Sequence, residues 1–161
     1  MDRMSEIRRL STGTKLTFHR AFDMLSIDKS SGERYIESLS KVLKDIAILE
    51  CDRLLTSGFE SSASSGMGAL RSIVEIVRAE EYPYVVVAAA GVKPQNAREI
   101  LLKTCVGGLH AGSSLTSSFS NEPATSSNKN NVESRQNSDM LLYERVDSKL
   151  VREFVEKTTQ F

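Results

Sequence analysis

The alternation of short apolar strand patterns with longer helical stripes constrains the fold of this sequence more than any other feature. The run Tyr84 to Val92, YVVVAAAGV, is apolar on both faces, as a covered parallel strand usually is. Further strand patterns occupy Leu16–Phe22, Arg53–Gly58 and Gly108–Ser114. Successive patterns begin about 25–40 residues apart, which is the usual length of a parallel strand with its crossover helix. The sequence therefore predicts an α/β fold with a parallel sheet.

Helical patterns lie between and after these strands. Apolar residues there recur at three- and four-residue steps, the period of one helix face. The residues that carry this period are Tyr35, Leu39, Val42, Leu43 and Ile46; Leu70, Ile73, Val74 and Val77; Ile100, Leu101 and Leu102; and Leu150, Val151, Phe154 and Val155. Pro94 suits the first turn of the third helix, and Asp147 suits the N-cap of the last.

Two segments depart from this regular series. Met4, Ile7 and Leu10 form a short helical stripe that no strand pattern precedes, so we expect the sequence to begin within a series of strand–helix units. Residues 116–139 are rich in serine and asparagine and show no period. We expect them to form a long mobile loop. Their composition favours a tolerated insertion over an active-site lid.

Composition excludes several classes of function. The formal net charge is zero, which gives no reason to expect a nucleic acid or an acidic membrane surface as partner. No apolar run approaches the roughly 20 residues of a membrane span, and the N-terminus lacks the apolar region of a secretory signal. Cys51 and Cys105 form no CxxC motif, so we expect a protein of a reducing compartment without a disulfide framework or zinc site.

Polar and small residues gather where the predicted strands end. Ligands of parallel α/β folds bind beyond the C-terminal ends of the strands. The candidate binding residues at these ends are His19, Arg20, Asp23, Thr56, Ser57, Gly58, Gly91 and His110, and they include both histidines of the chain. We expect these residues to converge on one pocket.

Arg20 raises a specific question, because it lies within an otherwise apolar strand pattern. In a regular strand it would share a face with Phe18 and Phe22. A buried arginine needs a partner, and Asp23 and hydroxyl groups of neighbouring strand ends are within reach. Arg20 would also suit a fork-like contact with a carboxylate or phosphate ligand. A purely structural network of His19 and Arg20 explains the pattern equally well.

The sequence contains no established catalytic motif: GxSxG, HExxH and the Walker pattern are all absent. Gly91 and Gly112 could allow close approach of the backbone to a phosphate group, although a glycine is also common in ordinary turns. Cys51 and Cys105 could bind a soft metal such as Cu(I). We predict instead that both are small buried hydrophobic residues, the more usual role of a lone cysteine.

Four segments together resemble the CutC family of copper homeostasis proteins. LTFHRAFDM (16–24) is the most specific, and RLLTSGFESSA (53–63) is similar to the family's next strand and loop. VVVAAAGVKPQN (85–96) and GLHAGSS (108–114) follow in the same order. The eight candidate residues named above match the family's motifs at the barrel mouth. Ala89 and Ala90 depart from the family, which usually has glycines there.

The resemblance implies a (β/α)8 TIM barrel, a fold that needs about 250 residues. It covers strands 5–8 only, so we expect residues 1–161 to form a partial CutC-like domain, a truncated half-barrel with a flexible insertion at 116–139. It also implies copper homeostasis, Cu(I) binding, self-association, and a cytoplasmic or nuclear location. The cysteines associated with copper in some members lie in the other half, so no copper ligand carries over to this sequence.

Three hypotheses follow from the sequence. The first is a copper homeostasis protein that binds and handles Cu(I) and is impaired by truncation, a binding protein and not a demonstrated enzyme. The second is an enzyme that binds a small anionic or phosphorylated substrate at the barrel mouth, with Arg20 holding the anion and His19 or His110 as general acid or base. The third is a half-barrel that needs a partner half or dimerisation, because it exposes two sheet edges and an inner apolar face.

Overall fold

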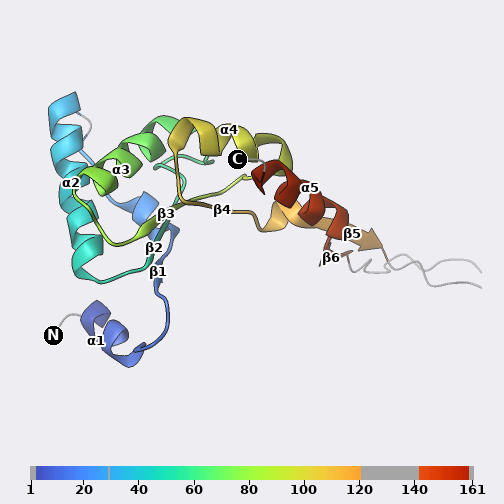
Figure 1. The fold of residues 1–161 in the computed structure, drawn as a ribbon, viewed down its shortest axis with the longest axis horizontal. Helices are drawn as coiled ribbons and strands as arrows, with labels where there is room; N and C mark the ends of the chain where they lie inside the picture. The colour runs from blue at the N-terminus through green and yellow to red at the C-terminus, as the bar shows by residue number, and fades with distance from the viewer. Residues whose placement is uncertain (1–2, 29, 121–141, 160–161) are drawn as a thin grey trace, which may run out of the picture.

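A four-stranded parallel sheet forms the centre of the computed structural model, which describes residues 3–28, 30–120 and 142–159 (Figure 1). The strands lie in sequence order, and each pairs in parallel with the next. They are β1 (Thr17–Phe18), β2 (Arg53–Thr56), β3 (Val85–Ala89) and β4 (Gly108–His110). The predicted α/β class with a parallel sheet is therefore confirmed.

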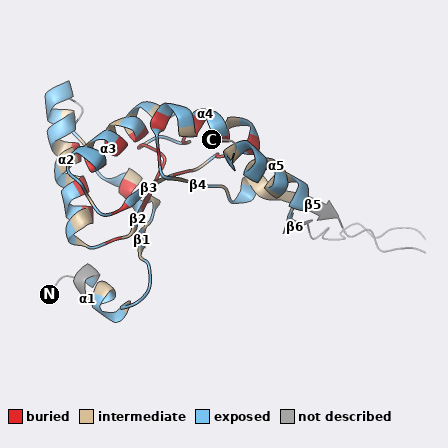
Figure 2. Ribbon diagram, viewed as in Figure 1, coloured by how far each residue is buried: buried red, intermediate tan, exposed pale blue. Residues whose placement is uncertain are grey.

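Helices cover one face of this sheet: α2 (Gly32–Ile48), α3 (Met67–Ala79) and α4 (Pro94–Thr104). The apolar stripes predicted from the sequence supply the contact. Their fully buried members include Leu39, Leu43, Leu70, Ile73 and Ile100, and Figure 2 shows the buried residues concentrated where helices and sheet meet. Burial of one such side chain contributes roughly 1.5–3 kcal/mol to the free energy of unfolding.

Local sequence signals set the helix ends. Ser31 caps α2 by accepting a hydrogen bond from the backbone N–H of Arg34 at 3.2 Å. Pro94 opens α4, as predicted. Asp147 accepts a hydrogen bond from the N–H of Lys149 at 2.8 Å just before α5 (Ser148–Thr159), so its predicted capping role is also confirmed. In Figure 1, α5 lies beside α4.

The predicted strand Leu16–Phe22 is wrong beyond Phe18. The chain leaves the sheet there, and residues Arg20–Met24 form a short 3-10 helix, η1. Phe22 is thereby fully buried, with its ring centroid 4.9 Å from that of Phe59. The alternating faces expected of a strand therefore do not apply to Arg20. Tertiary contacts of Phe22 override the strand preference of this aromatic segment.

The N-terminal stripe forms helix α1 (Arg3–Leu10), as predicted. Two ion pairs of Arg8 tie it to the rest of the chain, one with Glu50 (3.3 Å) and one with Asp52 (3.7 Å). Ile7 and Leu10 remain largely exposed. Among the described residues, no helix is long and apolar enough to cross a membrane.

The expectation of a loop over residues 116–139 is wrong at its start. After a short 3-10 turn, η2 (Ser113–Leu115), residues Thr116–Ser120 form strand β5. This strand pairs antiparallel with β6 (Leu142–Val146). This hairpin depends on backbone pairing with a segment more than twenty residues away, so the local sequence pattern could not reveal it. The rest of the expected loop, 121–139, lies outside the described residues.

Candidate functional site

The carboxylate of Asp23 is the centre of a polar network at the ends of β1 and β2. It accepts hydrogen bonds from Arg20 Nε (2.9 Å), Thr56 Oγ1 (2.5 Å) and the backbone N–H groups of Ser57 (3.0 Å) and Phe59 (3.2 Å). Its side chain is only 6% exposed. A buried carboxylate with this many donors is well satisfied, so the network can be rigid.

These hydrogen bonds determine the charge of Asp23. Burial alone would raise the pKa of its carboxyl group, but the hydrogen bonds from Thr56, Ser57, Arg20 and Phe59 outweigh burial and hold the pKa below its usual value. Asp23 is therefore a carboxylate at neutral pH. Its negative charge fixes Arg20, which also donates from Nη2 to Ser57 Oγ at 3.0 Å.

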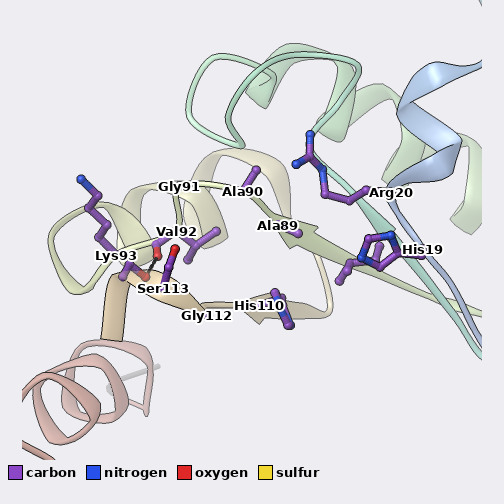
Figure 3. A pocket seen from close by; sticks show the side chains of 12 residues that line it. His19, Arg20, Ala89, Ala90, Gly91, Val92, Lys93, His110, Gly112 and Ser113 are labelled. Carbon is purple, nitrogen blue, oxygen red and sulfur yellow. Dashed lines mark hydrogen bonds between the residues drawn. The ribbon is translucent and has the colours of Figure 1, made fainter. Parts of the chain in front are cut away.

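A pocket of about 540 Å³ opens beside Arg20, at the C-terminal ends of the strands. We call it the strand-end pocket, and it is lined by His19, Arg20, Leu55, Ala89, Ala90, Gly91, Val92, Lys93, His110, Gly112, Ser113 and Ser114. In Figure 3, His19 and Arg20 lie on one side, and Lys93 and Ser113 lie on the other. His110 lies between them along the lower wall. The pocket thus joins cationic and hydrogen-bonding groups from separate strand ends.

The loop after β3 has an unusual backbone. Ala90 and Gly91 both have positive φ angles, +73° and +64°. Neighbouring residues hold this conformation: Ala63 donates its N–H to the carbonyl of Ala90 at 2.9 Å, and Asn96 Nδ2 donates to the carbonyl of Gly91, also at 2.9 Å. Such local strain concentrates at ligand-binding positions and persists only where the surroundings enforce it.

Comparison with known proteins gives this geometry its family context. A profile of the CutC family matches residues 1–115, which hold the whole four-stranded sheet and every residue of the strand-end pocket. The chain belongs to the CutC family. Its resemblance to CutC in the four sequence motifs is thereby confirmed.

Individual CutC relatives match this chain over part of their own length. CutC of Vibrio parahaemolyticus is 35% identical over 104 residues, which are 65% of this chain and 36% of that protein. CutC of Aliivibrio fischeri is 34% identical over 63% of this chain and 35% of its own length. The matched segment therefore spans about a third of these curated relatives.

The fold comparison agrees with the sequence comparison. The crystal structure of a Streptococcus agalactiae CutC, named provisionally as a copper homeostasis protein, superposes with a TM-score of 0.53 at 20% identity. The superposition covers 67% of this chain and 48% of that one. The fold thus corresponds to part of a CutC TIM barrel.

The structure divides the eight candidate residues of this CutC chain into two groups. His19, Arg20, Gly91 and His110 line the strand-end pocket, as predicted. The other four, Asp23, Thr56, Ser57 and Gly58, lie behind Arg20 and do not line it. Asp23, Thr56 and Ser57 thus position Arg20 and are not themselves contact residues.

Sequence reasoning missed Lys93 and Val92 as pocket residues. A signal for Lys93 was present, because this cationic residue lies between the β3 loop and Pro94, directly before a helix that starts at the same edge of the sheet. Val92 carried no signal, because it is a buried core residue that also borders the pocket.

The two cysteines of this CutC chain differ in environment. Cys51 is buried, as predicted, and burial raises the pKa of its thiol. Cys105 is exposed, so the prediction that it is buried is wrong. It ends α4 with a φ of +57°, a conformation that turns the chain out of the helix. Within the described residues, no three or more His, Cys, Asp or Glu side chains group as a metal site.

The strain at Ala90 leads to a first prediction. Replacing Ala90 by glycine should raise the free energy of unfolding by about 1 kcal/mol, because a residue with a Cβ pays roughly 1–2 kcal/mol in the left-handed region and glycine does not. Urea denaturation would measure the change. Ala89→Gly is the adjacent control: Ala89 is a buried residue of β3 without a positive φ, so its replacement should lower stability. Equal loss of stability in both variants would contradict the assignment of strain to Ala90.

Proposed function

We propose that the strand-end pocket binds a small anionic ligand and that Arg20 is its principal contact. The observation that carries the proposal is the fixed guanidinium at the pocket wall. Arg20 has five N–H donors. The one on Nε is directed to Asp23 and one on Nη2 is directed to Ser57, which leaves other donors for a ligand. The side chain is 35% exposed, so a ligand can reach it.

Other parts of the pocket support an anion. Lys93 lines the opposite wall and is a second cationic residue at the pocket, although Figure 3 shows its side chain directed away from Arg20. Ser113 adds a hydroxyl group that can donate to an anion, whereas the hydroxyl of Ser114 already donates to the carbonyl of Val92. Arginine forks recognise carboxylate and phosphate groups in two-point contacts, and these groups are the ligand chemistry that we infer.

Titration calorimetry with inorganic phosphate tests this proposal. We expect phosphate to bind, and Arg20→Ala to weaken binding by about 10- to 100-fold through the loss of charge-assisted hydrogen bonds. Arg71→Ala is the matched control, because Arg71 forms an exposed ion pair with Glu75 on α3 away from the pocket. Equal affinities of the two variants would contradict the role of Arg20.

Copper handling is the second candidate function. The name of the streptococcal structure supports it, as does the presence of His19 and His110 in one pocket, since imidazole nitrogen is a copper ligand. In this proposal the chain handles Cu(I) as cargo in the cytoplasm or the nucleus, and its four strands correspond to strands 5–8 of the family barrel. An enzymatic role would place His19 or His110 as general acid or base beside the anion.

Competition for Cu(I) against a chelator of known affinity tests the copper proposal. His19→Ala and His110→Ala should each weaken Cu(I) binding, whereas Cys105→Ala, which changes an exposed thiol outside the pocket, should not. Unchanged Cu(I) affinity in the double histidine variant would contradict it. Phosphate binding by that double variant would show whether the anion contact of Arg20 is independent of copper.

A further inference from the structure

The strand-end pocket is larger than a single phosphate ion requires. Its volume of about 540 Å³ lies within the range of roughly 300–1,000 Å³ in which proteins hold whole organic ligands. Part of its lining is apolar, formed by Leu55, Ala89 and Val92, and Figure 3 shows Ala89 between Arg20 and Lys93. An inorganic ion held at Arg20 would leave these apolar side chains facing water. The pocket therefore suits an organic ligand whose body covers them.

The lining of the pocket is biased toward positive charge. Arg20 and Lys93 are its two cationic residues, and none of the described residues that line it is an aspartate or a glutamate. This bias is a property of the pocket and not of the sequence as a whole, which contains 21 basic and 21 acidic residues. The arrangement favours a ligand of net negative charge.

Arg20 alone cannot balance the charge of such a ligand. Its Nε lies 2.9 Å from the buried carboxylate of Asp23, so much of its charge is already offset within the protein. Arg20 therefore supplies fixed hydrogen-bond donors more than net charge. Lys93 differs, since no ion pair among the described residues includes it. Its charge is available to a ligand.

The backbone of Lys93 is held in place, whereas its side chain is exposed. Its N–H donates to Asn96 Oδ1 at 2.7 Å, and its carbonyl accepts from the N–H of Ala97 at 3.0 Å in the first turn of α4. The side chain extends away from Arg20 in Figure 3. A lysine ammonium lies on a flexible four-carbon stem, so it can turn toward an anionic group near Ser113.

We propose that the ligand of the strand-end pocket carries two anionic groups, each a phosphate or a carboxylate, joined by a short organic linker. One group binds the free donors of Arg20. The linker lies against Ala89 and Val92. The second group binds Lys93 and the hydroxyl of Ser113 at the opposite wall. The ligand class is thus that of small molecules with two phosphates, or with one phosphate and one carboxylate. This inference rests on the proposed anion binding at Arg20.

Titration calorimetry with synthetic phosphonates tests the inference. Butylphosphonate carries one anionic group, whereas ethane-, butane- and hexanebisphosphonate carry two at increasing separation. We expect at least one bisphosphonate to bind about tenfold or more tightly than butylphosphonate, because the second contact forms within a ligand that is already bound. Arg20→Ala should weaken the binding of both kinds of ligand.

Lys93→Met separates the second contact from the first. Methionine keeps a flexible, unbranched side chain and removes the charge. The variant should bind the best bisphosphonate about tenfold more weakly, and its loss of affinity for butylphosphonate should be much smaller. Lys103→Met is the matched control, because Lys103 lies on α4 outside the pocket and pairs with Glu99. It should bind every ligand as the wild type does.

The possible failures are distinguishable. Bisphosphonates that bind no more tightly than butylphosphonate would overturn the inference and leave the proposed anion site at Arg20 intact. Equal losses for both kinds of ligand in Lys93→Met would also overturn it, because Lys93 would then act only through long-range attraction. A wild-type chain that binds neither phosphate nor any phosphonate would contradict the proposed function itself.

Discussion

Replacing Asp23 by asparagine is expected to lower the free energy of unfolding by about 3 kcal/mol. The variant keeps the size of the side chain but removes the charge that Arg20, Thr56 and Ser57 all contact. One end of the asparagine amide carries N–H donors, so at least one present donor would face another donor. Chemical denaturation followed by circular dichroism would measure the loss.

Asp28→Asn is the matched control for this experiment. Asp28 is also a loop carboxylate that accepts a backbone hydrogen bond, from Ser30 at 2.9 Å, but it is exposed and forms no ion pair with the described residues. Its replacement should change stability little. We also expect Asp23→Asn to weaken phosphate binding, since Arg20 would lose its fixed position. A variant as stable as the wild type, with unchanged phosphate affinity, would contradict the central role of Asp23.

The same carboxylate predicts a dependence of stability on pH. The pKa of Asp23 is lower in the folded chain than in the unfolded chain, where it is about 3.9. The stabilisation is therefore complete above about pH 4 and is lost as the pH falls through the lower pKa of the folded state. Wild-type stability should fall more steeply on acidification than that of Asp23→Asn. Parallel curves for the two proteins would contradict this assignment.

The pairing of Arg20 with Asp23 could be predicted from sequence, whereas the backbone that brings them together could not. Their closeness in sequence made the partner evident, and a hydroxyl from the next strand end was expected as well. The 3-10 turn at Arg20–Met24 depends on contacts with Thr56, Ser57 and Phe59, more than thirty residues away. Local sequence propensity alone predicts a strand for this aromatic segment.

A similar distinction applies to the pocket and to the helices. Strand ends of a parallel sheet must meet at one edge, so the convergence of His19, Gly91 and His110 was predictable. The helices with a clear apolar period were predictable for a different reason, because each helix must bury one face against the sheet. The exposure of Cys105 was not, since it depends on a left-handed residue at the end of α4.

Gly66→Ala is expected to have the largest effect on stability, a loss of more than about 3 kcal/mol. A Cβ added at Gly66 would overlap the carbonyl oxygen of Ser57, a backbone atom that cannot move away alone. A Cβ added at Gly58, which has a φ of +75°, would in turn overlap the carbonyl oxygen of Gly66. The two glycines let the loop after β2 pass over itself, and this crossing places Ser57 against Asp23.

Gly68→Ala is the matched control two residues further along. Gly68 lies in the first turn of α3, a Cβ there would meet no atom within 4 Å, and alanine favours the helix by up to about 1 kcal/mol. We therefore expect opposite signs from the same substitution in urea denaturation. Because Ser57 positions both Asp23 and Arg20, Gly66→Ala should also abolish phosphate binding, whereas Gly68→Ala should preserve it. If Gly66→Ala bound phosphate as tightly as the wild type, the position of Arg20 would not depend on the loop after β2. That result would contradict the proposed role of Ser57 in positioning Asp23 and Arg20.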